Sequence, residues 1–337
     1  MLKKRSLANL PTRIQKLERI SRELKGPEIY VKRDDETGLE FSGNKIRKLE
    51  FVAEDALSKG CNALITCGAV QSNHCRATAA LGAKLGIPVF LVLKQNQEPD
   101  YIGNYLLDYL FGASITLITE EEYNHRRGNV MLRLRDQLEK KGLNPYLIPE
   151  GASNGLGCFG YAYAIEEILM QEKEFGRHFD RIVVATGSGS TLGGLILGKE
   201  LFEHPGEMVG INITADAPTF QKRISLMLKQ ALEHIPNHQI TKAVNSSGSH
   251  PIFAQQKINI IDGYVGDGYG KSTQMEWDFI KKIAQQEGLL LDPVYTGKAF
   301  YGLVQEIKKG SFDQDQRILF IHTGGIFGLI PPQGLQR

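Results

Sequence analysis

Lys45 is the residue whose type and position most strongly suggest covalent chemistry. It opens an apolar helical pattern in the run FSGNKIRKLE (41–50), with Arg47 and Lys48 beside it. An amine near the positive end of a helix and next to other cations has a lowered pKa, and only the uncharged amine attacks a carbonyl to form a Schiff base. The spacing alone also allows the alternative that these basic residues form a solvated helix start.

A polar run with the properties of an anion site follows the apolar segment at 62–66. It reads GAVQSNHCRATAA (68–80). Ser72 and Asn73 favour the N-terminal cap of a helix, and the alanine-rich remainder favours the helix itself. The free backbone N–H groups at such a cap can hold a carboxylate. Capping for its own sake is the alternative, and His74 taken alone is more often an ordinary hydrogen-bonded histidine.

A glycine- and serine-rich loop predicts a phosphate site. The run ATGSGSTLGGL (185–195) follows an apolar segment and leads into a helical pattern at 193–202. Glycines let the backbone approach a phosphate, hydroxyl groups add hydrogen-bond donors, and the helix dipole favours a dianion. The residues of the predicted cradle are Gly187, Ser188, Gly189, Ser190 and Thr191.

Two nucleotide-binding alternatives fit the glycines less well. A dinucleotide fold could place Asp216 on a ribose, but Leu192 stands where GxGxxG requires its third glycine. The run GDGYGKST (266–273) has three residues between its first and last glycines, whereas a Walker A loop has four. A single phosphate is therefore favoured over a pyrophosphate or ATP, and Tyr269 is a candidate ligand contact.

Hydroxyl side chains next to glycine occur twice near the C-terminus. The run LDPVYTGK (291–298) contains Tyr295 and Thr296, and IHTGGIF (321–327) places Thr323 at the end of a predicted strand. Ligands of α/β proteins bind at the carboxyl ends of strands. Turn chemistry alone could account for either run, but both together with the earlier loops favour one shared site.

Apolar runs alternate with helical patterns along most of the chain, which is typical of βαβ units and a largely parallel sheet. This alternation predicts the α/β class. Strand signals gather before residue 120 and after residue 180, which allows two sheets, although no linker or repeat marks a boundary. Strands are expected at 62–66, 89–93, 115–118, 181–185, 209–214 and 317–322, and helices at 130–141, 161–171, 220–235 and 274–286.

Composition excludes several classes of protein. Of 337 residues, 40 are Lys or Arg and 38 are Asp or Glu, so a net charge of +2 offers no field for a nucleic acid or an anionic membrane. No apolar run reaches the ~18 residues of a membrane span, and the basic first segment lacks the apolar stretch of a secretory signal, so a cytoplasmic protein is expected. The four cysteines form no CxxC pair and the eight histidines no HExxH motif, so no metal site is expected.

Seven segments, taken in order, resemble one family: the fold-type II pyridoxal-phosphate enzymes of the tryptophan synthase β-chain superfamily, in the branch of 1-aminocyclopropane-1-carboxylate deaminase and D-cysteine desulfhydrase. The segments are VKRDD, SGNKIRKLEF, QSNHCRATAA, TGSGST, GDGYG, DPVYTGKA and HTGG, and they extend from residue 31 to residue 325. The resemblance implies bound pyridoxal 5′-phosphate, a small amino-acid substrate, and a lyase or deaminase reaction.

The resemblance assigns four features to the cofactor. Lys45 is similar to the lysine that binds it as a Schiff base and moves the α-proton of the substrate. Asn73 is similar to the asparagine that hydrogen-bonds the phenolic oxygen of the cofactor ring, and the loop at 187–191 to the phosphate cradle. Thr323 resembles the partner of the pyridine nitrogen, and its neutral hydroxyl would leave that nitrogen largely unprotonated.

The remaining candidates concern the substrate. Ser72 is similar to the residue that holds the substrate carboxylate, and Asn73, His74 and Thr296 are further candidates for substrate binding. Tyr269 and Tyr295 resemble the catalytic tyrosines.

The resemblance also implies a smaller α/β domain at 48–160 and a larger one formed by 1–47 and 161–337, each with a mainly parallel twisted sheet. The cofactor would lie in the cleft between them, and a homodimer is expected.

Thr296 favours one substrate over another. Deaminases of this family carry a glutamate after the tyrosine of the DPVY segment, where its carboxylate keeps the pyridine nitrogen protonated and strengthens the electron sink. 1-Aminocyclopropane-1-carboxylate has no α-hydrogen and needs that stronger sink, whereas D-cysteine has both an α-hydrogen and a thiolate leaving group. We therefore predict D-cysteine desulfhydrase activity. The alternatives are 1-aminocyclopropane-1-carboxylate deaminase, L-cysteate sulfo-lyase, a cofactor-binding protein without catalysis and, from another class, an NAD-dependent oxidoreductase.

Overall fold

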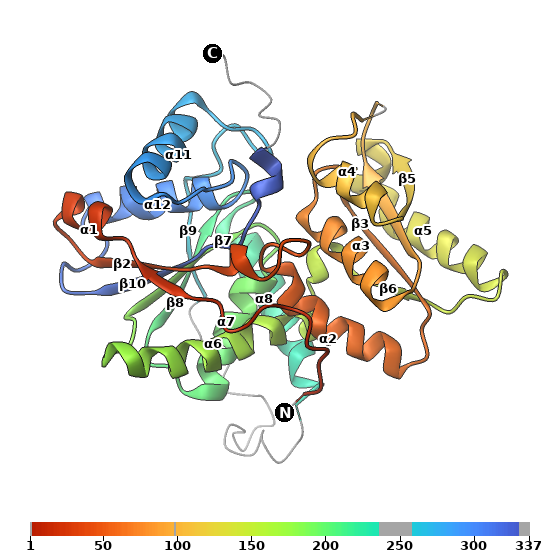
Figure 1. Ribbon diagram of the computed structural model, residues 1–337, viewed down its shortest axis with the longest axis horizontal. Coiled ribbons are helices and arrows are strands. Elements are labelled where there is room, and N and C mark those ends of the chain that lie inside the picture. The colour runs from red at the N-terminus through yellow and green to blue at the C-terminus, as the bar shows by residue number, and fades with distance from the viewer. Residues whose placement is uncertain (1, 98, 236–257, 330–337) are drawn as a thin grey trace.

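The strands of the chain form two separate sheets, as the two groups of apolar runs allow (Figure 1). The computed structural model describes residues 2–97, 99–235 and 258–329. One sheet has six strands in the order β1-β2-β10-β7-β8-β9, and the other has four in the order β5-β4-β3-β6. Every pair is parallel except β1 with β2. The predicted α/β class is confirmed.

The six predicted strands are all present, with ends that differ by at most three residues. They correspond to β3, β4, β5, β7, β8 and β10, while the four other strands were not predicted. The strands are β1 (Ile14–Lys16), β2 (Glu28–Lys32), β3 (Ala63–Ala69), β4 (Val89–Lys94), β5 (Ser114–Ile118), β6 (Pro145–Leu147), β7 (Arg181–Thr186), β8 (Glu207–Asn212), β9 (Asn259–Ile261) and β10 (Arg317–Ile321).

The predicted helices are also present, and two of them are much longer than their apolar patterns suggest. None of the helices within the described ranges is long and apolar enough to cross a membrane. The α-helices are α1 (Glu18–Leu24), α2 (Lys45–Ser58), α3 (Asn73–Leu85), α4 (Gly103–Leu110), α5 (Glu120–Glu139), α6 (Gly155–Phe175), α7 (Ser190–Phe202), α8 (Ala217–Leu232), α11 (Gln274–Glu287) and α12 (Thr296–Lys308), and the short 3₁₀ helices are η1 (Asp34–Glu36), η2 (Glu150–Ala152) and η3 (Ile326–Leu329).

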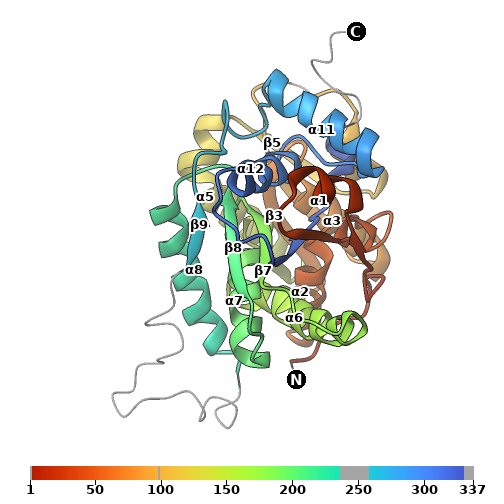
Figure 2. The same ribbon diagram turned by 90° about the vertical axis from the view of Figure 1, so that its left-hand side faces the viewer.

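The six-stranded sheet is buried on both faces. Helices α1, α11 and α12 lie on one side of it, and α6, α7 and α8 on the other (Figure 2). Successive side chains of a strand point to opposite faces, so a doubly covered strand is apolar throughout. In β7, Val183 packs into the core under α12, whereas Ile182 and Val184 pack into the core over α6 and α7. This explains why β7 reads as an uninterrupted apolar run.

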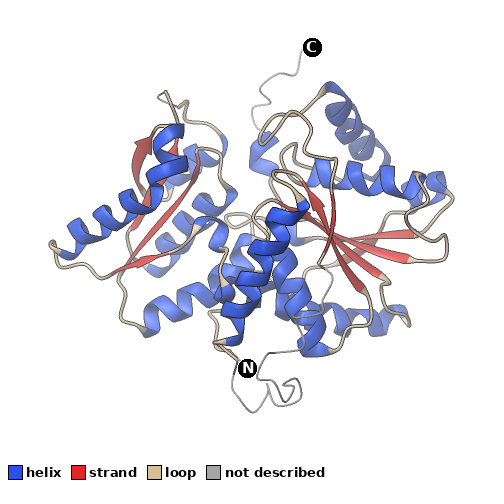
Figure 3. Ribbon diagram, turned by 180° about the vertical axis from the view of Figure 1, so that it is seen from behind, coloured by secondary structure: helices blue, strands red, loops and turns tan. Residues whose placement is uncertain are grey.

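Helix α2 links the two sheets. It packs on α6, which belongs to the layer beneath the six-stranded sheet, and on α3, which covers the four-stranded sheet. Seen from behind, the strands form two groups with helices between them (Figure 3). Because the strands within each sheet are parallel, the loops after β3, β7 and β10 all leave from carboxyl ends, and these ends face the space beside the N-terminus of α2.

Candidate active site

A cavity of about 410 Å³ lies where these loops meet the start of α2. A wider cavity of about 820 Å³ adjoins it and shares Asn73, Tyr269 and Tyr295 with it. Most of the site residues predicted from the sequence line the inner cavity, although they come from six separate segments of the chain. They are Lys45, Ser72, Asn73, His74, Gly187, Ser188, Gly189, Thr191, Tyr269, Tyr295 and Thr323.

Lys45 has the properties of a nucleophilic amine. It is the first residue of α2, and its partly buried side chain lines the cavity. Burial lowers the pKa of its ammonium group to about 8, and the carboxylate of Glu150 partly opposes this shift. The amine is therefore uncharged in a useful fraction of molecules near neutral pH.

Buried ion pairs and backbone contacts fix the start of α2. Arg47 donates to both oxygens of Asp34 at 2.8 Å and to Glu167 at 2.8 Å. The backbone N–H of Asn44 donates to the carbonyl of Thr323 at 3.1 Å, which ties the residue before Lys45 to the loop after β10. A buried, bidentate guanidinium pair has a defined geometry. The position of Lys45 is therefore set by contacts between α2 and residues from distant parts of the chain.

The N-terminus of α3 forms as the sequence predicts. Ser72 is the N-cap residue, and its hydroxyl accepts a hydrogen bond from the backbone N–H of Cys75 at 3.2 Å. Asn73 is the first residue of the helix, and its side-chain oxygen accepts from Asn104 Nδ2 at 3.0 Å. The first N–H groups of a helix lack partners within the helix, and Ser72, Asn73 and His74 line the cavity, so this turn suits a carboxylate.

His74 lies in the cavity wall, and its hydrogen bonds determine which ring nitrogen carries the proton. Thr66 donates its one hydroxyl proton to the carbonyl of Ile148 at 2.9 Å. The same hydroxyl lies 2.8 Å from His74 Nε2, so in this second contact it can only be the acceptor. The ring proton is thereby assigned to Nε2, and Nδ1 has no partner within the described residues. Burial lowers the pKa of His74 well below its ordinary value, and the charges of Lys45 and Lys48 lower it further.

The glycine loop after β7 is shaped for an anion. Gly189 is the N-cap of α7 with φ of +97°, and a Cβ atom there would lie 3.0 Å from Ile224 and 3.1 Å from Met227. A Cβ atom on Gly187 would lie 3.1 Å from the ring of Tyr295. Glycine is therefore required by backbone conformation at one position and favoured by space at the other. The first N–H groups of α7 have no acceptor within the helix and remain available for a phosphate.

Lys48 lies behind this loop and was not predicted to take part. It is completely buried, and its amine donates to Ser190 Oγ at 2.8 Å. Ser153 bonds to Ser190 at 3.0 Å and to Ser188 at 2.8 Å, so the amine and the three hydroxyls form a continuous polar chain. Burial lowers the pKa of Lys48 well below its usual value, as does the charge of Lys45. None of the ion pairs in the described part of the chain includes Lys48.

We expect Lys48→Met to weaken retention of a phosphate-bearing ligand about tenfold, because it removes a donor and a latent positive charge beneath the cradle. The ligand-free variant should nevertheless be more stable at neutral pH. Since burial lowers the folded-state pKa of Lys48, the wild-type free energy of unfolding decreases as the pH falls below about 10.5, and the variant loses this contribution.

Ligand dialysis and urea unfolding between pH 6 and 10 measure both effects. Lys59→Met, at the exposed end of the same helix, is the matched control. If Lys48→Met retained the phosphate-bearing ligand as well as wild type does, the amine of Lys48 would not contribute to holding the phosphate.

Two tyrosines line both the inner and the outer cavity. The hydroxyls of Tyr269 and Tyr295 lie 2.5 Å apart, and their rings meet edge to face with centroids 5.8 Å apart. Burial raises the pKa of Tyr269 to about 12 and that of Tyr295 well above its ordinary value. Both phenols are therefore protonated near neutral pH and can donate a proton or a hydrogen bond.

Thr296 and Ser190 are the predicted site residues that do not line either cavity. Thr296 is completely buried, and its hydroxyl donates to Asp292 at 2.7 Å and accepts the Asp292 backbone N–H at 2.8 Å. It thereby stabilises the turn that presents Tyr295.

Asp216, the acid of the dinucleotide alternative, caps α8 by accepting the backbone N–H of Thr219 at 2.7 Å.

The turn around η2 contributes to the site without having been predicted. Gly151 has φ of +69°, and a Cβ atom there would lie 3.5 Å from Lys45 Nζ and 3.2 Å from Ser188 Oγ. Ser153 joins the polar chain behind the glycine loop. The run PEGASNG (149–155) has the glycine, serine and asparagine content of a ligand loop, and this is the signal that could have identified it.

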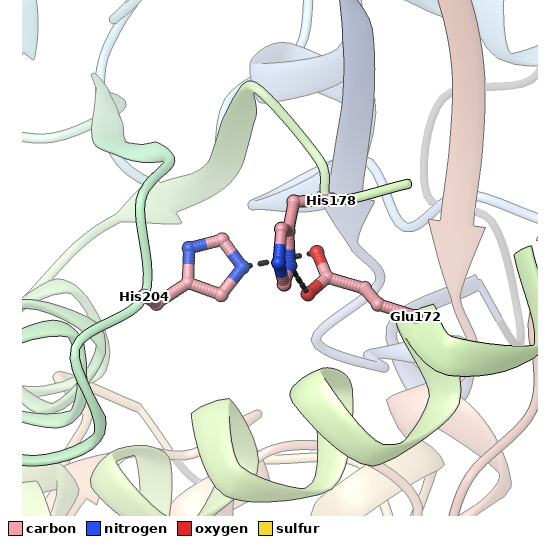
Figure 4. A group of neighbouring side chains, drawn as sticks. All are labelled: Glu172, His178 and His204. Carbon is pink, nitrogen blue, oxygen red and sulfur yellow. Dashed lines mark hydrogen bonds and ion pairs between the residues drawn. The ribbon is translucent and has the colours of Figure 1, made fainter. Parts of the chain in front are cut away.

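A second group of polar side chains lies on α6 and in the loops that lead into β7 and β8 (Figure 4). Glu172 accepts hydrogen bonds from His178 at 2.6 Å, from His204 at 3.0 Å and from the backbone of Phe179 at 2.7 Å. His204 Nδ1 accepts the backbone N–H of Gly206 at 3.0 Å, so its proton lies on Nε2. A metal ion bound at Nε2 of His204 would replace this proton. Both ring nitrogens would then have to act as acceptors, whereas a neutral imidazole has only one acceptor nitrogen. Glu172, His178 and His204 therefore form a hydrogen-bonded group that holds two loops together.

The inner cavity fits a phosphorylated aldehyde. It offers an amine with a lowered pKa, a glycine-lined helix N-terminus for a phosphate, and the amide of Asn73 and the hydroxyl of Thr323 for ring heteroatoms. Pyridoxal phosphate carries all the complementary groups. The residues that would hold it are those predicted from the sequence, with Lys48 added behind the loop.

Comparisons with known proteins agree with this fit. The sequence profile of the family described as pyridoxal-phosphate dependent enzymes matches residues 5–324. A protein of Pyrococcus abyssi, provisionally described as a 1-aminocyclopropane-1-carboxylate deaminase, is 42% identical over 318 residues, which cover 94% of this chain and 90% of the relative. The mitochondrial bifunctional D-cysteine desulfhydrase/1-aminocyclopropane-1-carboxylate deaminase of Arabidopsis thaliana is 38% identical over 333 residues, covering 96% of this chain and 78% of the relative.

A solved structure of similar sequence supports the same assignment. The crystal structure of an ACC deaminase homologue is 38% identical, with a TM-score of 0.84 over 96% of this chain and 92% of the other. The family profile spans nearly the whole chain, and the cavity holds the groups that the cofactor requires. The chain therefore belongs to the family of pyridoxal-phosphate-dependent enzymes.

Proposed function

We propose that the chain catalyses β-elimination of D-cysteine, in which D-cysteine and water give pyruvate, hydrogen sulfide and ammonia. The observation that carries this proposal is that the side chains of Thr323 and Thr296 are neutral hydroxyls. Thr323 offers an uncharged hydroxyl to the inner cavity, and Thr296 is withdrawn to Asp292. Glu150 is the one carboxylate among the described residues that line this cavity, and it acts electrostatically on Lys45.

The side chains can be given separate tasks in this reaction. Bound pyridoxal phosphate supplies an electron-withdrawing ring that stabilises the charge left when the α-proton is removed. Lys45, with its lowered pKa, is the base that takes this proton, and the α3 N-terminus at Ser72 holds the substrate carboxylate. We assign to the protonated hydroxyls of Tyr269 and Tyr295 the donation of a proton to the departing sulfur.

The same features disfavour opening of a cyclopropane ring. 1-Aminocyclopropane-1-carboxylate lacks an α-hydrogen, so a ring bond must break and the electron sink must be stronger. Keeping the pyridine nitrogen protonated requires an acidic partner, and the threonine hydroxyls cannot supply a negative charge. D-Cysteine needs less assistance, because Lys45 can remove its α-proton and sulfide is a good leaving group. The deaminase is the second candidate, which the names of the relatives favour.

A substrate panel tests this proposal. The enzyme reconstituted with pyridoxal phosphate is assayed on D-cysteine, L-cysteine, L-cysteate and 1-aminocyclopropane-1-carboxylate, with release of 2-oxo acid, ammonia, sulfide and sulfite measured separately. We expect kcat/KM for D-cysteine to exceed that for the cyclopropane acid by about 100-fold or more. The Lys45→Ala protein provides the background. Efficient formation of 2-oxobutanoate from the cyclopropane acid would overturn the proposal, and sulfite as the main product would assign the enzyme to L-cysteate.

Two structural expectations belong to the same proposal. The domains at 48–160 and at 1–47 with 161–337 are supported by the two sheets, although both boundaries lie inside helices, α2 and α6. The inner cavity is lined from both sides of this division, as a cofactor between domains requires. A cytoplasmic homodimer remains our expectation from the sequence and its resemblance.

A further inference from the structure

Asn73 offers the cavity one particular end of its amide, and the surrounding hydrogen bonds determine which end that is. An asparagine side chain can present either an acceptor oxygen or a donor NH₂, and the two orientations have almost the same shape. An anionic or carbonyl oxygen of a ligand is bound only by the NH₂ end. The neighbours of Asn73 therefore decide what it can bind.

The decision begins at Arg76, which lies on α3 one turn from Asn73. A guanidinium group can only donate hydrogen bonds. Arg76 Nε lies 2.7 Å from a side-chain atom of Asn104 on α4, and that atom must be the oxygen. Both residues are completely buried, so water does not compete for these groups.

Asn104 transmits this polarity to Asn73. With its oxygen turned to Arg76, its NH₂ group donates to the carbonyl of Gln71 at 2.9 Å and to Asn73 Oδ1 at 3.0 Å. The oxygen of Asn73 is thereby occupied, and its own NH₂ makes no hydrogen bond within the described part of the chain. Asn73 lines both cavities.

Arg76 is itself anchored beside the catalytic lysine. Its terminal nitrogens donate to the carbonyl of Glu40 and, at 3.0 Å, to the carbonyl of Ser42, three residues before Lys45. Burial lowers the pKa of Arg76 to about 10, and the nearby Asp108 opposes that shift, so the guanidinium stays charged at neutral pH. The donor at the start of the relay is therefore permanent under working conditions.

We propose that Asn104, held by Arg76, is a positioning residue that fixes the amide of Asn73 with its NH₂ directed to the bound cofactor. This inference rests on the proposed function only for the identity of the group that Asn73 meets. The relay gives Asn73 one donor orientation before any ligand arrives, and an oxygen that carries negative charge on the cofactor ring gains most from it. Asn104 contacts neither substrate nor cofactor in this account.

The sharpest test is Asn104→Asp, which keeps the shape and replaces the donor with an acceptor. The carboxylate still pairs with Arg76, but its other oxygen repels the carbonyl of Gln71 and Asn73 Oδ1. Asn73 then turns its NH₂ towards the carboxylate and its oxygen towards the cofactor. We expect the pH midpoint of the visible absorption of the bound cofactor to shift by about one unit or more, and its dissociation constant to increase about tenfold.

Companion variants distinguish a relay from a general loss of structure. Asn73→Ala should shift the midpoint in the same direction, and combining it with Asn104→Asp should add nothing, because both act through one amide. Asn129→Asp makes the same chemical change on the exposed surface of α5 and should match wild type. Asn104→Ser, which keeps an acceptor for Arg76 but loses the two amide donors, replaces Asn104→Asp under the same criteria if the latter does not fold.

The outcomes separate this inference from the proposed function. A wild-type midpoint in the Asn104 variant, together with a shifted midpoint in Asn73→Ala, would overturn the relay and leave the proposed function intact. An unchanged midpoint in Asn73→Ala would remove Asn73 from the cofactor and would overturn the relay, whereas the proposed function is decided by the substrate panel alone. Additive shifts in the double variant would show that Asn104 acts independently of Asn73, which also contradicts the relay.

Discussion

Lys45→Ala is expected to abolish turnover and the absorption band that the cofactor acquires when it is bound to a lysine. The variant removes the amine that forms the covalent link and also the base that takes the α-proton, so kcat should fall by about 10⁴-fold or more. The fold should persist, because α2 is held through Arg47, Asp34 and Glu167 and not through Lys45. Absorption spectra with and without borohydride, together with the sulfide assay, measure the effect.

Lys48 supplies the critical comparison, because it is the other amine on the same turn of α2. It lies behind the glycine loop and donates to Ser190, so it should not form the covalent link. If Lys45→Ala keeps the band while Lys48→Ala loses it, the roles of the two lysines have been assigned the wrong way round.

Gly189→Val should prevent cofactor retention. The backbone at Gly189 has φ of +97°, a conformation that a β-branched residue adopts only with strain of ~1–3 kcal/mol. A Cβ atom would also press on Ile224 and Met227, which pack beneath the loop. Displacement of the loop moves the N–H groups of the first turn of α7 away from a phosphate. Cofactor content after exhaustive dialysis should fall by about tenfold or more.

A matched control separates the loss of the cradle from backbone strain. Gly60→Val also places valine at a positive φ, of +69°, but a Cβ atom there has no neighbour within 4 Å. Its cofactor content should equal that of wild type. Gly189→Ala carries less bulk and serves if the valine variant is unstable. Full occupancy in both Gly189 variants would show that this loop does not hold the phosphate.

The sequence predicted those strands that carry long apolar runs, and it missed strands whose residues are few or mixed. In β7 and β10, both faces are covered and almost every residue is apolar. β1, β6 and β9 have three residues each, too few to show a period. β2 is buried between β1 and β10, but its sequence EIYVK begins and ends with a charged residue. Lys32 is buried because Glu167, Gln171 and the carbonyl of Thr12 satisfy its amine.

The candidate site was predictable where one short segment carries the signal. Lys45, Ser72 and the loop at 187–191 each combine a helix start with the side chains that need it. Groups joined across the fold give no such signal. Arg76 meets Asn104 across 28 residues, and Lys48 meets Ser190 across 142.

Thr296 shows the converse limit of sequence patterns. The pattern places it next to Tyr295, in a segment that does reach the cavity. Its side chain turns back to Asp292, four residues earlier, and completes a local turn. The direction of a side chain in such a turn depends on backbone angles that residue types alone do not determine. Its prediction as a substrate contact remains to be tested by the substrate panel.

We propose above all that Lys45 carries the cofactor in the cavity between the two sheets. Reduction of the enzyme with borohydride, proteolysis and mass spectrometry of the peptides identify the lysine that has become covalently modified. We predict a single phosphopyridoxyl group on the peptide that contains Lys45, with none after substitution of Lys45 by alanine. Modification of Lys48 or of any other lysine in place of Lys45 would contradict the account.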